Sequence, residues 1–503
     1  MSLITDKIVP GREERLGAGI AFGGSACALG KGRPGCLKHA EREFSQSGLC
    51  QMLPMLGMLL TLPDTALIVH GGLGCSGPGI MMNSSNIRLR NIQRGVAKDP
   101  DTRWISSNLT EYEVINGGGD KLEAAIRTIN DRFHPKSIIV LQTCTPAIIG
   151  DDAATIVDHL REELGVPILL ACCEGFRTKV WATGYDVAFH ALVHGFIEND
   201  KDGRPARKAP WKPGDRPRIN LINLASLGKP DEDEIERMLG RLGIDVTIGP
   251  NFATREEFRR MTQADLTVSV CPTHDDYFVE YLKEEYGIPS VLKEMPIGIE
   301  NTRNWLLDIA AHFGLQGEAN RFCDDEAEKV RKAVLPFLPT LRNKRVFFSA
   351  GEFRALVTAS LFQELGMEVV GLRSYHHDDF GTPFYDRLVQ KQDGKDFPVD
   401  VANFQPFELT NLLTRIVPDL FVGHITDNVW AAKLGLPTMT IFRIFDVYTG
   451  FRGYFEVARR AARALRNPAF NRTLSANSPQ MYRPQWYKED PFKYIKPGLE
   501  EAV

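Results

Sequence analysis

The chain alternates short apolar runs, rich in β-branched residues, with amphipathic segments of helical periodicity along most of its length. This alternation is typical of strand–helix–strand units, which build parallel sheets. It recurs in three parts of the chain, so we predict an α/β fold of three Rossmann-like domains with mainly parallel sheets. The expected strands are residues 66–69, 137–141 and 168–172, then 219–224, 245–248 and 266–270, and finally 346–349, 368–371 and 420–422. The expected helices include residues 232–242, 255–262, 354–365, 406–416 and 428–434.

Two polar segments separate the three parts. Residues 199–218 are basic and proline-rich, which interrupts regular structure, and residues 324–345 are charged. A length of 503 residues suits three domains of roughly 150 residues each. We therefore expect an N-terminal α/β domain at 1–215, a middle α/β domain at 216–340, and a C-terminal α/β domain with a C-terminal extension at 341–503.

Charge and hydropathy argue against two classes of partner. Lys and Arg number 60 against 64 Asp and Glu, a net charge of −4, so no global positive field attracts nucleic acid or anionic lipid. The apolar run at 49–62 contains Pro54 and is shorter than the roughly 20 residues of a membrane span. Residues 1–15 have no apolar signal core. We expect a cytoplasmic protein that binds neither nucleic acid nor membrane.

Three of the nine cysteines lie where ligands collect in open α/β domains, and a fourth lies at a helix start. Cys75, Cys144 and Cys271 each follow a predicted strand, in GGLGCSGPG, TCTPAIIGDD and CPTHDD, and Cys50 opens a predicted helix. A single cysteine of this kind is more often a small buried apolar residue. Four of them among glycines indicate iron–sulfur chemistry, because glycine lets inorganic sulfide approach the backbone.

Several longer motifs carry a resemblance to a known family. They follow one another as FSQSGLCQMLPMLGMLLTL, IVHGGLGCSG, INGGGDKLEAAI, TCTPAIIGDD, CCEGFR and GMEVVG. In this order the chain resembles component 1 of the nitrogenase superfamily. The CEGFR, CPTHDDYFVEYLKEEYGIP and YHHDDFG segments resemble its α-type (D-like) subunit rather than its β-type. The resemblance implies a buried metallocluster site between the domains.

The resemblance also implies two metal centres and two protein partners. Cys50, Cys75 and Cys144 would bind an 8Fe-7S, P-cluster-like relay cluster shared with a homologous β (K-like) subunit in an α2β2 complex. Cys271 would anchor a nitrogenase-type iron–sulfur cofactor of unassigned heterometal, with Arg177 of CEGFR beside it. Electrons would come from a separate ATP-hydrolysing, homodimeric 4Fe-4S reductase protein, since the chain has no phosphate-binding loop motif.

The remaining cysteines receive no ligand role. Cys172 and Cys173 lie beside the CEGFR motif and are expected to pack in the interior. Cys27, Cys36 and Cys323 match no position of the family motifs.

The chain departs from nitrogenases at positions that surround their cofactor. Nitrogenases follow CEGFR with a glutamine and a histidine, where this chain has Trp181 and Tyr185. A phenol, with an ordinary pKa of about 10, thus replaces an imidazole that titrates near neutral pH. The family motif YHGF, whose histidine binds the far metal, is YTGF here with Thr449, and a hydroxyl is a poor ligand for such a metal.

Three histidines could hold the far end of a cofactor instead. His376 and His377 lie in YHHDD, and His424 follows the predicted strand LFV. We take His376 as the candidate cofactor-binding residue. A histidine satisfied by its own loop is the alternative for all three, and so is a cofactor held by an exogenous ligand.

The substitutions predict a pocket that is more apolar and less protic. Trp181, Tyr185 and Thr449 are the candidate catalytic-pocket residues, with Phe442 beside them, and plain packing of the aromatic rings is the alternative. Among relatives, the chain most resembles methylthio-alkane reductases, which cleave carbon–sulfur bonds in small thioethers to methanethiol and a hydrocarbon. We therefore expect a small organic sulfur substrate.

Other functions remain open at this point. A cofactor-maturation scaffold of the α type fits the loss of the histidine at Thr449, although a scaffold does not need the complete relay set. A nitrogenase that reduces dinitrogen is disfavoured by Tyr185 and Thr449 together. A tetrapyrrole reductase is disfavoured because the Cys271 segment would have no use there.

Overall fold

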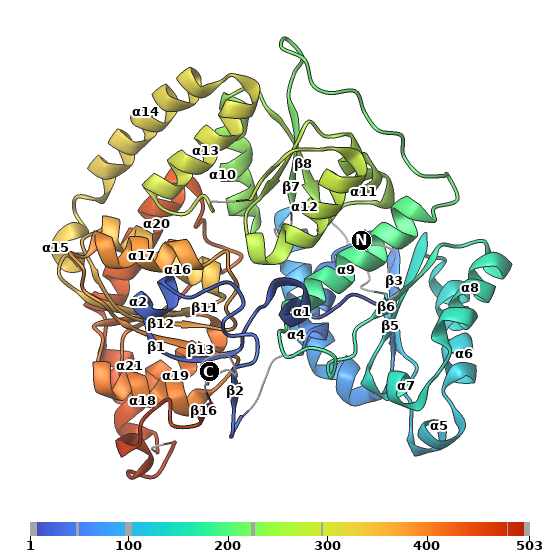
Figure 1. Ribbon diagram of the computed structural model, residues 1–503, viewed down its shortest axis with the longest axis horizontal. Helices are drawn as coiled ribbons and strands as arrows, with labels where there is room; N and C mark the ends of the chain where they lie inside the picture. Colours follow the sequence, from blue (N-terminus) through green and yellow to red (C-terminus); the bar gives the residue numbers. More distant parts are fainter. Residues whose placement is uncertain are drawn as a thin grey trace.

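The computed structural model describes residues 8–46, 50–95, 103–222, 227–292, 295–479 and 481–496, without the side chains of 78–86 and 425. These residues form an α/β protein with three mainly parallel sheets, each flanked by helices. Figure 1 shows them as three lobes, coloured blue to cyan, green to yellow, and orange to red along the chain. The predicted fold class is confirmed. No helix among the described residues is both long and apolar enough to span a bilayer.

The first sheet is wholly parallel, with strand order β4-β3-β5-β6. Its strands are β3 (Thr65–His70), β4 (Trp104–Ser106), β5 (Ser137–Gln142) and β6 (Ile168–Cys172). The accompanying helices are α3 (Met52–Leu59), α4 (Leu73–Gln93), α5 (Glu111–Asn116), α6 (Gly119–Phe133), α7 (Cys144–Ile149), α8 (Ala153–Leu164), α9 (Thr183–Val193) and the π-helical turn η1 (His194–Glu198). The strands are short and almost fully buried, as expected of a parallel sheet covered on both faces.

The second sheet is also parallel, with order β10-β9-β7-β8. Its strands are β7 (Arg218–Ile222), β8 (Asp245–Gly249), β9 (Leu266–Ser269) and β10 (Ser290–Val291). Its helices are α10 (Lys229–Arg241), α11 (Arg255–Arg260), η2 (Met261–Gln263), α12 (Pro272–Tyr286), α13 (Ile299–Phe313), α14 (Gln316–Val334) and α15 (Leu338–Leu341). The end of the predicted strand 219–224 lies outside the described residues.

The third sheet has six strands in the order β1-β13-β12-β11-β14-β15. Its strands are β1 (Ala21–Ser25), β11 (Arg345–Ala350), β12 (Glu368–Ser374), β13 (Pro398–Ala402), β14 (Leu420–Gly423) and β15 (Thr438–Thr440). Its helices are α2 (Ala26–Gly30), α16 (Glu352–Glu364), α17 (Thr382–Lys391), α18 (Pro406–Ile416), α19 (Ile425–Lys433), α20 (Gly450–Arg466) and α21 (Ala469–Asn477). All neighbours are parallel except β1, which pairs antiparallel with β13.

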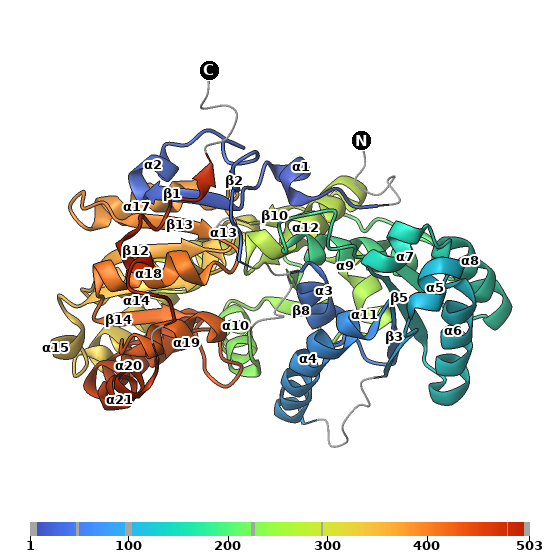
Figure 2. The ribbon, with the colours of Figure 1, turned by 90° about the horizontal axis from the view of Figure 1, so that it is seen from below.

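The start of the chain therefore joins the last sheet rather than the first. After α1 (Arg12–Leu16), β1 extends the C-terminal sheet, and β2 (Glu41–Arg42) pairs with β16 (Ile495–Lys496) near the other end of the chain. Arg42 fixes this crossing, since its guanidinium donates to both carboxylate oxygens of Glu408 at 2.6 and 2.8 Å. Figure 2 shows the blue N-terminal strands beside the orange and red C-terminal lobe. Sequence patterning did not predict this crossing.

Side chains that follow strands of the three sheets contact one another. The Trp181 ring, which follows β6, lies 6.0 Å from the ring of Tyr375, which follows β12. Arg354, after β11, reaches His274, after β9, with 3.2 Å between nitrogens. Ligands of open α/β sheets bind at such strand ends, so this junction is where a site is expected.

Candidate functional site

Three thiols of the first sheet lie in neighbouring loops. Cys75 lies in the first turn of α4 after β3, and Cys144 opens α7 after β5. Because β3 and β5 pair in register, with His70 opposite Gln142, the two loops leave the sheet side by side. Cys50 precedes α3 and is exposed, whereas Cys75 and Cys144 are half-buried.

Gly175 of the CEGFR loop brings Cys50 and Cys144 together. Its backbone N–H donates to the Cys144 sulfur at 3.1 Å. A β-carbon at this position would lie 2.8 Å from the Cys50 sulfur and 3.7 Å from that of Cys144, so only glycine leaves both thiols their places. Burial raises the pKa of Cys50, and the charges of Cys144 and Cys75 add to that effect. The three predicted relay cysteines are therefore one group.

This group is not a site for a single ion. Among the described residues, no three His, Cys, Asp or Glu side chains converge closely enough to hold one metal ion.

Cys271 lies in a different, enclosed setting. It is 2% exposed and immediately precedes α12, whose start is set by Pro272. The Ser269 hydroxyl accepts from the Cys271 N–H at 2.9 Å and donates to Asp275 at 2.5 Å, which fixes the turn. Burial raises the pKa of the Cys271 thiol to about 11, although the charge of Arg354 works in the opposite direction.

Arg354 is the cation beside this thiol, and sequence reasoning missed it. It lies on α16 just after β11, is 8% exposed, and its Nη2 is 3.2 Å from Nδ1 of His274. Its guanidinium also lies over the ring of Phe442, 4.9 Å from the centroid. The signal was present, since GEFR directly follows a predicted strand, the same position that singled out the cysteines.

Tyr185 and Trp181 are brought to the same place. The Tyr185 ring stacks on His274 with centroids 4.1 Å apart, and Trp181 lies 6.4 Å from Tyr185. Burial raises the pKa of Tyr185 far above its ordinary value. Burial and the charge of Arg354 lower the pKa of His274 well below its ordinary value, so this imidazole is neutral. The pocket around Cys271 is therefore lined by aromatic rings.

The two histidines of YHHDD differ in their surroundings. His376 is fully buried, its Nε2 lies 3.5 Å from Asp378, and neither ring nitrogen has a hydrogen-bond partner within the described chain. His377 is paired with Glu352 at 2.7 Å, and Tyr385 donates to the same oxygen. His376 thus stays a candidate, whereas His377 is satisfied by its loop.

The contacts found for Thr449 and Arg177 do not include Cys271. Thr449 is fully buried at the start of α20, where its N–H and hydroxyl donate to Asp231 at 2.9 and 3.1 Å. Arg177 pairs with Glu174 at 3.1 Å on the loop of Gly175. It borders a hollow of about 720 Å³ beside β6 and α9. A place for either residue at a cofactor stays a prediction.

A buried ion network supports the pocket from the N-terminal side. The Arg12 guanidinium donates to Asp186 and Asp276, both at 2.9 Å, and Arg15 donates to the same two carboxylates at 2.8 and 2.6 Å. Asp186 follows Tyr185 on α9, and Asp276 lies on the helix that Cys271 begins. The network links α1 to both elements. The sequence GREER alone did not indicate this role.

Several buried polar atoms of residues that follow the strands at this junction have no partner among the described residues. They are Nε of Arg354, Nε1 of Trp181 and both ring nitrogens of His376. Unpaired buried polar atoms are costly and rare, so a group of them indicates a bound polar or charged species. The donor set, a thiol with cationic and neutral N–H groups, fits an anionic iron–sulfur cofactor.

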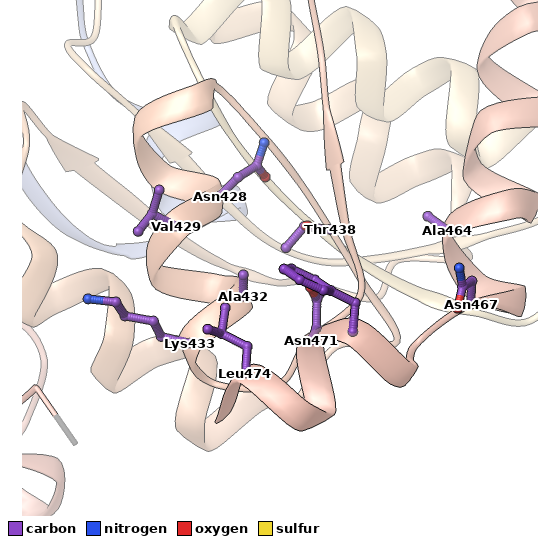
Figure 3. Close-up of a pocket in the computed structure, with 10 residues that line it drawn as sticks. Asn428, Val429, Ala432, Lys433, Thr438, Ala464, Asn467, Asn471 and Leu474 are labelled. Carbon is purple, nitrogen blue, oxygen red and sulfur yellow. The ribbon is translucent and has the colours of Figure 1, made fainter. Parts of the chain in front are cut away.

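Another hollow, of about 610 Å³, lacks such chemistry. It lies between α19, α20 and α21, and Figure 3 shows Val429, Thr438 and Leu474 on its wall. Its described lining holds Lys433 but no thiol, imidazole or carboxylate. We do not consider it a catalytic site.

The sequence pattern described as nitrogenase component 1 type oxidoreductase matches residues 50–466. The chain belongs to the nitrogenase component 1 family. It is similar to the nitrogenase molybdenum-iron protein alpha chain of Methanothermobacter marburgensis, with 26% identity over 87% of this chain and 90% of that one. It is equally similar to the nitrogenase iron-molybdenum cofactor biosynthesis protein NifE of Methanosarcina barkeri, with 26% identity over 82% and 87% of the two chains.

A solved structure supports the fold of this nitrogenase component 1 family member. The structure titled "Nitrogenase Cp1 at pH 5" matches 89% of this chain and 93% of its own, with a TM-score of 0.69 and 20% identity. This likeness shows the nitrogenase-like fold, and it leaves the substrate to be argued from the site.

Proposed function

We propose that the chain is the catalytic α-type subunit of a nitrogenase-like reductase, which cleaves carbon–sulfur bonds in small methylthio-alkanes. The observation that carries this proposal is the pairing of two different thiol sites in one chain. Cys50 and Cys144 flank Gly175 and Cys75 lies in the neighbouring loop, all at least partly accessible, whereas Cys271 lies in an enclosed aromatic pocket. An accessible relay and a buried reduction site are the two parts that such a reductase needs.

The relay group also supports the proposed β-type partner. Three thiols are too few for an 8Fe-7S cluster, so a second chain would supply the others. Three large apolar side chains near the group are exposed: Leu73 by 60%, Ile148 by 70% and Phe176 by 54%. Exposed apolar side chains next to an incomplete metal site are expected at a subunit interface. We propose an α2β2 complex that receives electrons from an ATP-hydrolysing 4Fe-4S reductase protein.

The pocket around Cys271 supports a small organic substrate. The cofactor, when bound there, would supply electrons to the substrate. The reaction adds two electrons and two protons to a thioether, breaks one carbon–sulfur bond, and releases methanethiol and a hydrocarbon. Tyr185 and Trp181 provide an apolar wall, and Arg354 provides a fixed positive charge where a thiolate product would develop.

A maturation scaffold is the second candidate, and one observation favours it. Thr449 is held by Asp231 and cannot replace the family's histidine, which suits a cofactor that must leave. Incubating the loaded complex with a cofactor-free acceptor protein separates the two. A reductase keeps its Cys271-dependent iron and turns over thioethers with its reductase protein, whereas a scaffold transfers that iron and turns over none.

A further inference from the structure

One imidazole at the carboxyl edge of the C-terminal sheet has no role in the proposal above. His424 follows β14 directly and precedes α19. Strand β14 lies between β11 and β15, with Gly423 opposite Ser349 on one side and Thr440 on the other. His424 therefore leaves the sheet between the loop that leads to Arg354 and the loop that leads to Phe442.

The backbone of His424 is fixed, and its side chain is free. Its N–H donates to the Ser349 carbonyl at 3.0 Å, and its own carbonyl accepts from the N–H groups of Asp427 and Asn428 at 3.1 Å. The Asp427 carboxylate is engaged by the Ser349 hydroxyl at 2.6 Å and the Tyr375 hydroxyl at 3.2 Å. No hydrogen bond to the His424 ring is formed by any described residue.

The His424 side chain is accessible and lies close to two charged groups. Burial lowers the pKa of the imidazole; the charge of Asp427 works in the opposite direction, and the charge of Arg354 lowers the pKa further. A neutral imidazole with an unused lone pair is the form of histidine that binds transition metals.

Arg354 is the charged residue that lies near both His424 and Cys271. Its guanidinium lowers the pKa of Cys271 as well as that of His424. Cys271 comes from the middle sheet and His424 from the C-terminal sheet, so the two side chains approach the cation from different domains. A species bound beside Arg354 can therefore be held from both domains.

The other candidate ligands are less suited. Thr449 is hydrogen-bonded to Asp231, and His377 is paired with Glu352. His376 has no hydrogen-bond partner among the described residues, but its Nε2 lies 3.5 Å from the Asp378 carboxylate. His424 is the accessible imidazole of the group.

We propose that His424 is the second protein ligand of the iron–sulfur cofactor that Cys271 anchors, in place of the histidine that Thr449 replaces. The inference rests on the proposed function, because it requires a cofactor at Cys271. It is an alternative to His376, which stays a candidate cofactor-binding histidine.

The test is pulsed electron paramagnetic resonance on the anaerobically purified complex with ¹⁵N-labelled histidine. We expect a nitrogen coupling at the Cys271-dependent centre in the wild type and in the control variant His159→Ala, whose ring is exposed on α8. We expect the coupling to be lost in His424→Ala, with less iron at that centre and an unchanged relay-cluster signal. An unchanged coupling in His424→Ala would overturn the ligand assignment.

A second measurement needs no variant. Diethyl pyrocarbonate should modify His424 in the cofactor-free complex and not in the loaded complex, as read by peptide mass spectrometry. Equal modification in both states would contradict the assignment. Absence of any Cys271-dependent iron in the wild type is a different result, since it contradicts the proposed function itself.

Discussion

Gly175 shows how one residue permits the grouping of thiols. It donates its N–H to the Cys144 sulfur and leaves room for the Cys50 sulfur where any side chain would intrude. At the same scale, Asp231 accounts for Thr449. Its carboxylate accepts hydrogen bonds from the N–H groups of Gly228, Tyr448 and Thr449 and from the Thr449 hydroxyl. Thr449 therefore joins the start of α20 to α10.

Substituting Gly175 tests the relay group. In Gly175→Ala the new methyl would lie 2.8 Å from the Cys50 sulfur, so the loop or the thiol must shift. We expect loss of most iron from the relay centre, retained iron at the Cys271 centre, and an unchanged circular dichroism spectrum. The matched control is Gly317→Ala on α14, where a methyl meets nothing within 4 Å. Full relay iron in Gly175→Ala would refute the grouping.

Asp231 predicts a pH dependence of stability. Burial raises its pKa from 3.8 to about 6, so the folded protein keeps a proton that the unfolded chain loses. Stability therefore falls as pH rises from about 4 to about 6, by about 3 kcal/mol for this group. Asp231→Asn should flatten this fall, as measured by denaturant unfolding at several pH values. Asp233 is exposed on the same helix, so Asp233→Asn should keep the wild-type dependence of stability on pH. The wild-type dependence in Asp231→Asn would contradict the account.

At the scale of elements, sequence reasoning succeeded where the pattern is local. Strands β3, β5, β6, β8, β9 and β14 lie within a residue or two of their predicted bounds, because buried parallel strands are short apolar runs. The antiparallel pairing of β1 with β13 could not be predicted, since it joins residues more than 370 positions apart and β1 has the sequence AFGGS.

Residues of the candidate site could likewise be predicted where the signal is local. Strand-end position indicated Cys75, Cys144 and Cys271, and the same rule would have found Arg354. Thr449 meets Asp231, which is 218 residues away in the chain, and no local pattern reveals which distant carboxylate a buried side chain will meet.

We expect a substitution in the short helix α1 to lower the stability of the protein strongly. Arg12→Ala would leave the buried carboxylates of Asp186 and Asp276 with Arg15 alone. Removing one partner of a buried ion network costs about 3–5 kcal/mol. Glu14→Ala, whose ion pair with Lys38 is exposed, should cost less than about 1 kcal/mol. Unfolding free energies measure both, and a similar cost for the two variants would contradict the role of α1.

At the scale of the whole molecule, the distribution of exposed apolar side chains indicates which face meets a partner. Leu73 and Ile148 lie on the helices that carry Cys75 and Cys144, and Phe176 follows Gly175 in the chain. Phe470 is equally exposed but lies on α21, which Figures 1 and 2 place on the opposite side of the molecule from α7. The face around the three thiols therefore has exposed apolar side chains beside it.

This face predicts the effect of a charge on assembly. Ile148→Asp would place a carboxylate where we propose that the β-type subunit packs, so the fraction of chain that co-purifies with that subunit should fall at least about tenfold. Phe470→Asp should co-purify as the wild type does. Size-exclusion chromatography of the co-expressed chains reads both outcomes, and equal assembly of the two variants would place the interface elsewhere.

The central claim is that a cofactor at Cys271 reduces a small thioether with electrons that pass through the relay thiols. The most direct measurement is product formation by the anaerobically purified complex, supplied with its reductase protein, ATP and a methylthio-alkane. The account predicts methanethiol and hydrocarbon in equal amounts, with turnover abolished in Cys271→Ala while the relay-centre iron stays. Thioether turnover that persists in Cys271→Ala, or a loaded and reduced wild-type complex that forms no methanethiol, would contradict it.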